Sequence, residues 1–258
     1  MEPGPLAHSV LAIPELRDHT IDLLCESPVD LLACSLVSKA WVWRAQFHLF
    51  REITLMPPND TKLLRLLMKR LEASPHLAHH IRHLKSSLKI HLLRGVMGML
   101  LPMLEEISLL CTRTQHEGHA DIETKLLVQS LLCLPTIRRV VLEGWFSSMS
   151  VIHTYFEDCI QRIRSLELLD VYAPDSDLDP TLASAFAPPK VQLSHITFPR
   201  DCQALDKWIT GPQSPFGFCY LQSVHMVVER WQTFRKVYSY LPWSYLCSAQ
   251  FLATSTWI

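Results

Sequence analysis

The chain has 258 residues, of which 48% are hydrophobic and 19% are charged, and its formal net charge at pH 7 is −1. This composition is too apolar for a disordered protein and allows one large domain or two small ones. A net charge so close to zero gives no indication of a nucleic-acid or membrane partner. Glycine is scarce, and neither the GxGxxG, the GxxxxGK nor the GxSxG pattern occurs, which disfavours phosphate-cradling loops and strained nucleophile elbows.

The eight cysteines are scattered and form no CxxC pair, a pattern typical of reduced, mostly buried thiols in an intracellular protein. The first ten residues have neither a basic region nor a long apolar core, so no signal peptide is predicted. The most apolar stretch, 92–111, contains Arg94, Pro102, Glu105 and Glu106, and therefore no membrane span is predicted there. We expect a soluble protein of the cytoplasm or the nucleus.

Three short helices are predicted within residues 13–50. Pro14 and Glu15 suit a helix start, because proline is tolerated in the first turn and an acidic side chain interacts favourably with the helix dipole. Pro28 breaks this helix, and Asp30 is expected to cap a second one, which is followed by an aromatic third segment. A unit of about 40 residues buries little surface, so it normally needs a neighbour to complete its core.

This segment resembles an F-box. The family pattern is an apolar-Pro-Glu-Leu start, an apolar helix, a Ser/Pro break, Asp-Leu, and a helix with Leu-Val-x-basic-x-Trp. The chain carries these features in the same order, as Ile13-Pro14-Glu15-Leu16, Ile21, Leu23-Leu24, Pro28, Asp30-Leu31 and Leu36-Val37-Ser38-Lys39-Ala40-Trp41. Residues 48–55 resemble the continuation found in fungal F-box proteins. Isoleucine in place of the leading leucine and serine in place of a common cysteine are the departures, and a generic helical cap is the alternative interpretation.

The resemblance implies docking onto the small adaptor subunit of an SCF-type ubiquitin ligase, and through that subunit onto a cullin. Such an interface is apolar, is formed by helices, and has few charges at its centre. Carried over position by position, the expected contacts are Ile13, Pro14, Leu16, Ile21, Leu24, Leu31, Cys34, Leu36, Val37 and Trp41.

From Phe50 onward the phrase apolar-x-x-apolar-x-apolar recurs, with start-to-start spacings of 23 to 33 residues and helical patterns between the copies. A strand and a helix repeated in this way are the plan of a leucine-rich repeat, whose units must stack to bury their apolar sides. The usual asparagine is absent from every copy, since Asn59 is the only asparagine and lies outside the phrase. The clear copies begin at Phe50, Leu104, Ile137, Ile163, Leu193 and Leu221, and weaker copies at Ile81 and Leu246 complete these spacings.

We therefore predict an α/β protein in which a three-helix F-box, residues 10–50, precedes an irregular leucine-rich-repeat-like solenoid with a parallel sheet, residues 51–258. An ordinary α/β domain is the alternative for the second region. If the strands form, the middle residue of each phrase points away from the core. These candidate target contacts are Ser108, Val141, Glu167, Thr197 and His225.

Three groups of residues have some likeness to metal sites. His79 and His83 are four residues apart, but no acidic residue or cysteine accompanies them between positions 73 and 94. His116-Glu117-Gly118-His119 is interpreted as a polar loop. Asp175, Asp177 and Asp179 begin like a calcium loop, but Pro180 occupies the position that requires glycine. We predict no metal, no cofactor and no catalytic residue.

Between Lys62 and Arg94 the chain has eight Lys or Arg residues and a single acidic residue, Glu72. One interpretation is the solvated face of a helix above a leucine stripe. The other is a basic patch that binds an acidic or phosphorylated target through charge-assisted hydrogen bonds. No aromatic residue alternates with these charges, which disfavours nucleic acid. The candidate patch consists of Lys62, Arg65, Lys69, Arg70, Arg82 and Lys85.

The expected function is therefore that of a substrate-recognition subunit. It would have no chemistry of its own and would act by raising the effective concentration of an unidentified target protein near the conjugating enzyme. The alternative is a non-catalytic interaction scaffold that acts outside a ubiquitin ligase.

Overall fold

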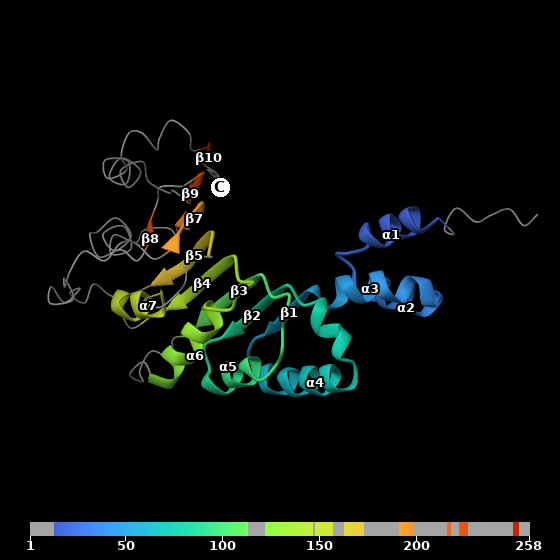
Figure 1. The fold of residues 1–258 in the computed structure, drawn as a ribbon, viewed down its shortest axis with the longest axis horizontal. Coiled ribbons are helices and arrows are strands. Elements are labelled where there is room, and N and C mark those ends of the chain that lie inside the picture. The colour runs from blue at the N-terminus through green and yellow to red at the C-terminus, as the bar shows by residue number, and fades with distance from the viewer. Residues whose placement is uncertain are drawn as a thin grey trace, which may run out of the picture.

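The computed structural model describes residues 13–112, 122–146, 148–156, 163–172, 191–198, 216–217, 222–226 and 250–252. These residues form an α/β fold in which N-terminal helices precede a parallel sheet that alternates with helices (Figure 1). Within the described ranges, no helix combines the length and the hydropathy that crossing a membrane requires.

Three helices form the N-terminal part: α1 (Pro14–Asp22), α2 (Pro28–Val37) and α3 (Lys39–Arg51). The prediction that Asp30 caps the second helix is wrong. The backbone N–H of Asp30 donates to the side-chain oxygen of Ser27 at 3.4 Å, so Ser27 is the cap and the helix begins with Pro28 in its first turn. Ser38 has an extended backbone and separates α2 from α3.

The three helices share a small core of their own. Its fully or nearly buried side chains are Ile21, Leu31, Cys34 and Ala45, one or two from each helix. Leu24, Trp41 and Leu49 pack around them and remain partly exposed. This core is small because three short helices can bury only a limited surface among themselves.

The sheet and its helices follow in chain order. The strands are β1 (Glu52–Leu55), β2 (His83–Ser87), β3 (Glu106–Cys111), β4 (Arg139–Trp145), β5 (Ser165–Tyr172), β7 (His195–Phe198), β9 (Ser223–Met226) and β10 (Gln250–Leu252). The helices are α4 (Asp60–Ala73), the 3-10 helix η2 (Pro75–His79), α5 (Ile90–Met97), α6 (Ile122–Leu132) and α7 (Met149–Phe156). A separate parallel pair is formed by β6 (Val191–Gln192) and β8 (Phe216–Gly217).

Each strand of the main sheet pairs in parallel with the strand before it, in the order β1-β2-β3-β4-β5-β7-β9-β10. The order never reverses, unlike that of a doubly wound sheet, where ligands bind at the reversal point. Because strand-to-strand crossovers keep one hand, a sheet that grows in one direction places its helices on one face. Helices α4 to α7 indeed lie along the same side of the strands (Figure 1).

The register explains the recurring phrase of the sequence. In the copies from Phe50 to Leu193, the second apolar residue of the phrase lies in a strand, and these residues align across the sheet. They are Ile53, Leu84, Ile107, Val140, Leu166 and Ile196, and all of them except Ile53 are buried. The next position along each strand points to the opposite face, because side chains alternate along a strand. This row consists of Thr54, Lys85, Ser108, Val141, Glu167 and Thr197, and His225 occupies the corresponding position of β9.

Candidate protein-binding surfaces

Helix α2 has an exposed apolar stripe. Leu31 and Cys34 point into the small N-terminal core, whereas Val29, Leu32 and Leu36, spaced by three and four residues, lie on the outer side. Their exposed fractions are 75%, 54% and 86%. Single exposed leucines are common on protein surfaces, but a run along one helix indicates a surface for a partner.

The ten predicted docking residues fall into three groups. The exposed ones are Ile13, Pro14, Leu16, Leu36 and Val37. Leu24 and Trp41 are half-buried, and Ile21, Leu31 and Cys34 belong to the core of the helices themselves. The surface that is available for docking therefore consists of the first group, together with Leu23, Val29 and Leu32, whose exposure the prediction missed.

An aromatic contact attaches the N-terminal helices to the sheet region. The imidazole of His80, which follows η2 and is 3% exposed, lies edge-on against Trp43 and Phe47 of α3, with ring centroids 4.6 Å and 6.1 Å away. Its Nε2 atom has no hydrogen-bond partner among the described residues. Burial, followed by the charges of His76, His79 and Arg82, lowers the pKa of His80 below 6.5, so the buried ring is neutral.

His80 should make the protein less stable as the pH falls. The unfolded chain takes up the proton of this histidine near pH 6.5, whereas the folded chain takes it up only at lower pH. The free energy of unfolding therefore decreases below pH 6.5, by at most about 1.4 kcal/mol per pH unit, until the folded-state pKa is reached.

His80→Phe keeps an aromatic ring at this position and should remove this part of the pH dependence. Guanidinium denaturation of both proteins at pH 7.5, 6.5 and 5.5 measures the difference. His19→Gln, on the exposed side of α1, is the control. Its free energy of unfolding should depend on pH with the same slope as that of the unmodified chain. Parallel slopes for the unmodified protein and His80→Phe would contradict the expectation.

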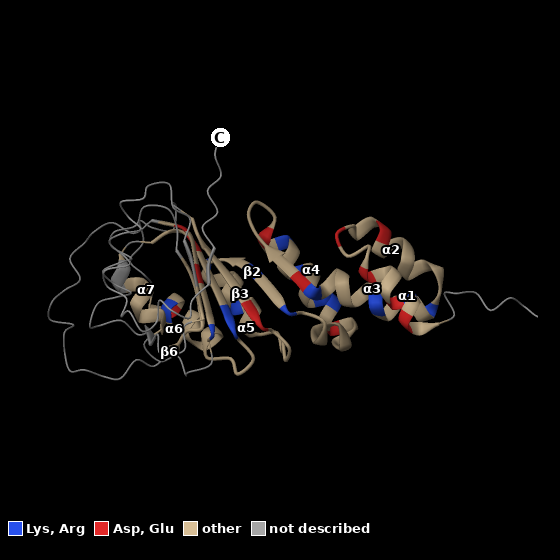
Figure 2. Ribbon diagram, turned by 90° about the horizontal axis from the view of Figure 1, so that it is seen from above, with Lys and Arg blue, Asp and Glu red and all other residues tan. Residues whose placement is uncertain are grey.

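The face of the sheet opposite the helices is largely polar, and several of its charges form ion pairs across strands. Arg139 on β4 lies between two carboxylates on the neighbouring strands, 3.2 Å from Glu106 on β3 and 2.6 Å from Glu167 on β5. Lys85 on β2 reaches across β3 to Glu143 on β4, at 3.0 Å. Opposite charges on adjacent strands stabilise the pairing of those strands. Figure 2 shows acidic and basic positions mixed along the strands.

This arrangement limits which predicted target contacts a partner could reach. Ser108 and Val141 lie on the polar face but are only 8% and 5% exposed. Ser108 is on β3, beneath the Lys85–Glu143 pair. Glu167 and Thr197 are partly exposed, and Leu169 on the same face is 37% exposed, so a partner would meet charged, hydroxyl and apolar side chains there.

The six residues of the predicted basic patch do not lie on one surface. Lys62, Arg65, Lys69 and Arg70 are exposed on α4, above a buried stripe that includes Leu64 and Leu67, and no ion pair involves these four among the described residues. Lys85 lies on the polar face of the sheet and pairs with Glu143. Arg82, directly before β2, pairs with Glu105 next to the N-terminal helices.

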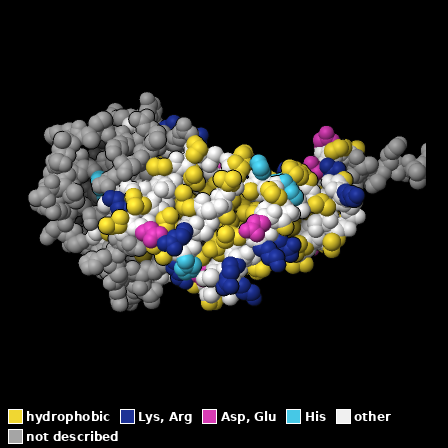
Figure 3. Space-filling model, turned by 60° about the horizontal axis from the view of Figure 1, so that its bottom comes forward, with side chains coloured by type: hydrophobic (Ala, Val, Ile, Leu, Met, Phe, Trp, Pro, Cys, Tyr) yellow, Lys and Arg dark blue, Asp and Glu magenta, His cyan; other side chains and the backbone are white. Residues whose placement is uncertain are grey.

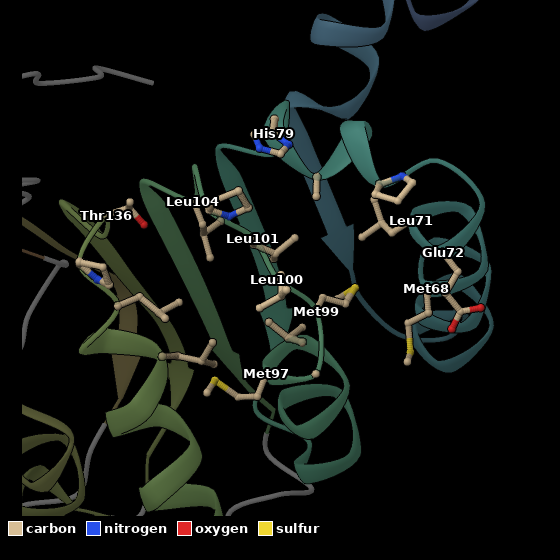
Figure 4. A pocket seen from close by; sticks show the side chains of 18 residues that line it. Met68, Leu71, Glu72, His79, Met97, Met99, Leu100, Leu101, Leu104 and Thr136 are labelled. Carbon is tan, nitrogen blue, oxygen red and sulfur yellow. The ribbon is translucent and has the colours of Figure 1, made fainter.

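A cavity of about 710 Å³ opens on the side of the sheet that carries the helices. Its walls come from α4, η2, α5, α6 and the segments that precede β3 and β4, with Met68, Met97 and Met99 among the lining side chains (Figure 4). Hydrophobic side chains gather over this side of the molecule (Figure 3). Glu72, His79 and Thr136 are the polar side chains of its wall, and they do not form a catalytic set.

The histidine pair considered as metal ligands is not on one helix face. His79 ends η2 and His83 begins β2, so the four-residue spacing does not bring the two rings together as it would on a helix. Across the described ranges, no group of three or more His, Cys, Asp or Glu side chains could hold a metal ion. The predicted polar loop at 116–119 and the aspartates at 175–179 lie outside the described residues.

A scan against protein-family models, a search of curated proteins and a search of solved structures each found no match to the chain. The case for a function therefore rests on the surfaces described above.

Proposed function

We propose that the protein is the substrate-recognition subunit of an SCF-type ubiquitin ligase, acting in the cytoplasm or the nucleus. The N-terminal helices, as an F-box, dock onto the small adaptor subunit and through it onto a cullin. The observation that carries the proposal is the exposed apolar stripe of α2, Val29, Leu32 and Leu36, within a segment that resembles an F-box. Exposed apolar side chains gain free energy when a partner covers them, at about 25 cal/mol for each Å² of apolar surface.

We further propose that residues 51–258 form an irregular leucine-rich-repeat-like solenoid that binds the target. Two features support this: each described strand of the main sheet joins the edge left by the strand before it, and α4 to α7 lie on a single side. Stacked strand–helix units produce this arrangement, because each unit buries its apolar side against its neighbours. The polar face is then open to a protein ligand, and the subunit needs no chemistry of its own, since it acts through proximity.

The double variant Pro14→Ala and Leu16→Ala should abolish co-purification with the adaptor subunit. Both side chains are exposed, so their truncation removes contact surface without disturbing the core of the helices. Two interface anchors are together worth about 2 kcal/mol or more, which predicts at least a 30-fold weaker affinity. Leu36→Ala with Val37→Ala, at the end of α2, should have the same effect. Affinity is measured by biolayer interferometry against the purified adaptor, after co-expression.

Leu66→Ala is the matched control, because Leu66 is 50% exposed but lies on α4, outside the N-terminal helices. It should bind the adaptor as the unmodified chain does. Unchanged binding by both double variants, with helical content intact by circular dichroism, would remove the basis for the adaptor role.

A further inference from the structure

Three arginines face a cavity of about 540 Å³ between the N-terminal helices and the start of the sheet. Arg44 and Arg51 come from α3, and Arg82 precedes β2. The imidazoles of His48 and His83 line the same cavity. Two carboxylates, those of Asp22 and Glu105, complete the charged lining, so three guanidinium groups against two carboxylates leave a charge of +1 from these five groups.

Arg44 is held rigidly at this site. Its Nε and Nη2 donate to the two carboxylate oxygens of Asp22, at 2.5 Å and 2.7 Å, and its Cζ lies 5.0 Å from the ring centre of Phe47. The hydrogen bond from Arg44, with a further one involving His48, lowers the pKa of Asp22 to about 2 despite partial burial. A guanidinium has five N–H donors, so three of them remain after the bidentate pair with Asp22.

Backbone hydrogen bonds hold together the two chain segments that carry the other two arginines. The N–H of Arg82 donates to the carbonyl oxygen of Arg51 at 2.9 Å, and the carbonyl of Arg82 accepts from the N–H groups of Glu105 and Glu106. The guanidinium of Arg82 pairs with Glu105 through Nη1 alone. The side chains of Arg51 and His83 have no hydrogen bond or ion pair within the described part of the chain. The cavity therefore has more donors than its own acceptors use.

We propose that this cavity is a binding site for a phosphate monoester. A phosphate monoester carries close to two negative charges at neutral pH and three acceptor oxygens, and this number of oxygens suits donors that approach from three arginines. A carboxylate offers one charge and two oxygens, and would leave Arg51 or Arg82 with fewer partners. A nucleic acid requires an extended basic surface, whereas Asp22 and Glu105 interrupt this one.

A bound phosphate would connect two parts of the molecule. Arg51 ends α3 and His83 begins β2. An anion that contacts both would therefore connect the N-terminal helices to the sheet. Binding should therefore raise the unfolding temperature of the chain, since a ligand that binds only the folded state stabilises it. This proposal does not depend on the adaptor role, because it concerns the isolated chain.

The test measures the affinity of the full chain by isothermal titration calorimetry, first for inorganic phosphate and then for a short peptide with one phosphoserine. The unphosphorylated peptide and sodium chloride at matched ionic strength are the blanks. We expect millimolar or tighter binding of phosphate, and at least a tenfold loss in Arg51→Gln and in Arg82→Gln. The side chain of Arg51 has no hydrogen bond or ion pair to lose within the described residues, so its replacement should leave the unfolding temperature without ligand unchanged.

Arg65→Gln is the control, because Arg65 is an exposed arginine of α4 outside the cavity. It should bind phosphate as the unmodified chain does. Tighter binding of the phosphopeptide than of phosphate would identify a phosphorylated protein as the source of the ligand, and equal affinities would identify a free phosphate or a small ester. The proposal is overturned if neither probe binds at millimolar concentration, if Arg51→Gln binds both normally, or if Arg65→Gln is equally weakened.

Discussion

Gly144→Ala is expected to destabilise the protein by on the order of 3 kcal/mol or more. Gly144 has a φ of 98°, a region that residues with a Cβ atom rarely adopt, and it lies where the pairing of β4 with β5 shifts register between Glu143 and Trp145. A Cβ atom at this position would lie 2.2 Å from the carbonyl oxygen of Cys111. That oxygen belongs to β3, which pairs with β4 along six residues, so it cannot move without disturbing the sheet.

The measurement is the guanidinium denaturation midpoint, with circular dichroism as the probe. Gly98→Ala is the matched control, because Gly98 is the C-cap residue directly after α5, its φ is −72°, and a Cβ there would be 3.4 Å from the nearest backbone atom. This second replacement should change the free energy of unfolding by less than about 1 kcal/mol, with a stabilising sign, since alanine restricts the unfolded chain. Equal midpoints for the two variants would show that the shifted register tolerates a side chain.

The strands were predictable because their signal is local. The apolar positions of each phrase alternate with period two, and the same positions line up across six strands, as Ile107, Val140 and Leu166 do. The bulge at Gly144 was not predictable, because a single glycine in a strand does not reveal its φ or what lies opposite. The start of α2 was misplaced since Ser27 and Asp30 are both good caps, and only the backbone geometry distinguishes them.

Which of the expected docking residues are exposed was predictable only in part. An apolar family pattern does not separate the residues that fill the core of a module from those that face a partner, and Leu31 and Leu36 have the same chemistry. Helical phase would have found Val29 and Leu32, which share a stripe with Leu36.

The six residues of the expected basic patch are spread over different surfaces for another reason. Charge was counted along the chain, but η2 and the start of β2 turn the chain between Arg70 and Arg82, and Lys85 follows on the far face of the sheet. The acidic partners are distant in sequence: Glu105 is 23 residues from Arg82, and Glu143 is 58 residues from Lys85. A count of local charge cannot include such partners.

Lys89→Met is expected to cost about 3 kcal/mol, because it would leave the carboxylate of Asp60 buried without its counter-charge. Asp60 is only 4% exposed, and its Oδ2 accepts from Lys89 Nζ at 2.5 Å, while Oδ1 accepts from the N–H of Thr61 at 2.7 Å. The hydrogen bond from Lys89 lowers the pKa of Asp60 below 3.8, against the effect of burial. The stabilisation is therefore present above about pH 4 and is lost as the pH falls through the lower pKa of the folded state.

A double-mutant cycle tests whether this cost belongs to the pair. Asp60→Asn removes the charge but keeps an oxygen that can accept from Thr61, so the combination of Asp60→Asn with Lys89→Met should be more stable than Lys89→Met alone. Guanidinium denaturation of the four proteins at pH 7 gives the coupling free energy, which we expect to be about 2 kcal/mol in favour of the intact pair. Additive effects of the two replacements would mean that Lys89 acts through the packing of its aliphatic stem at the start of α5 and not through its charge.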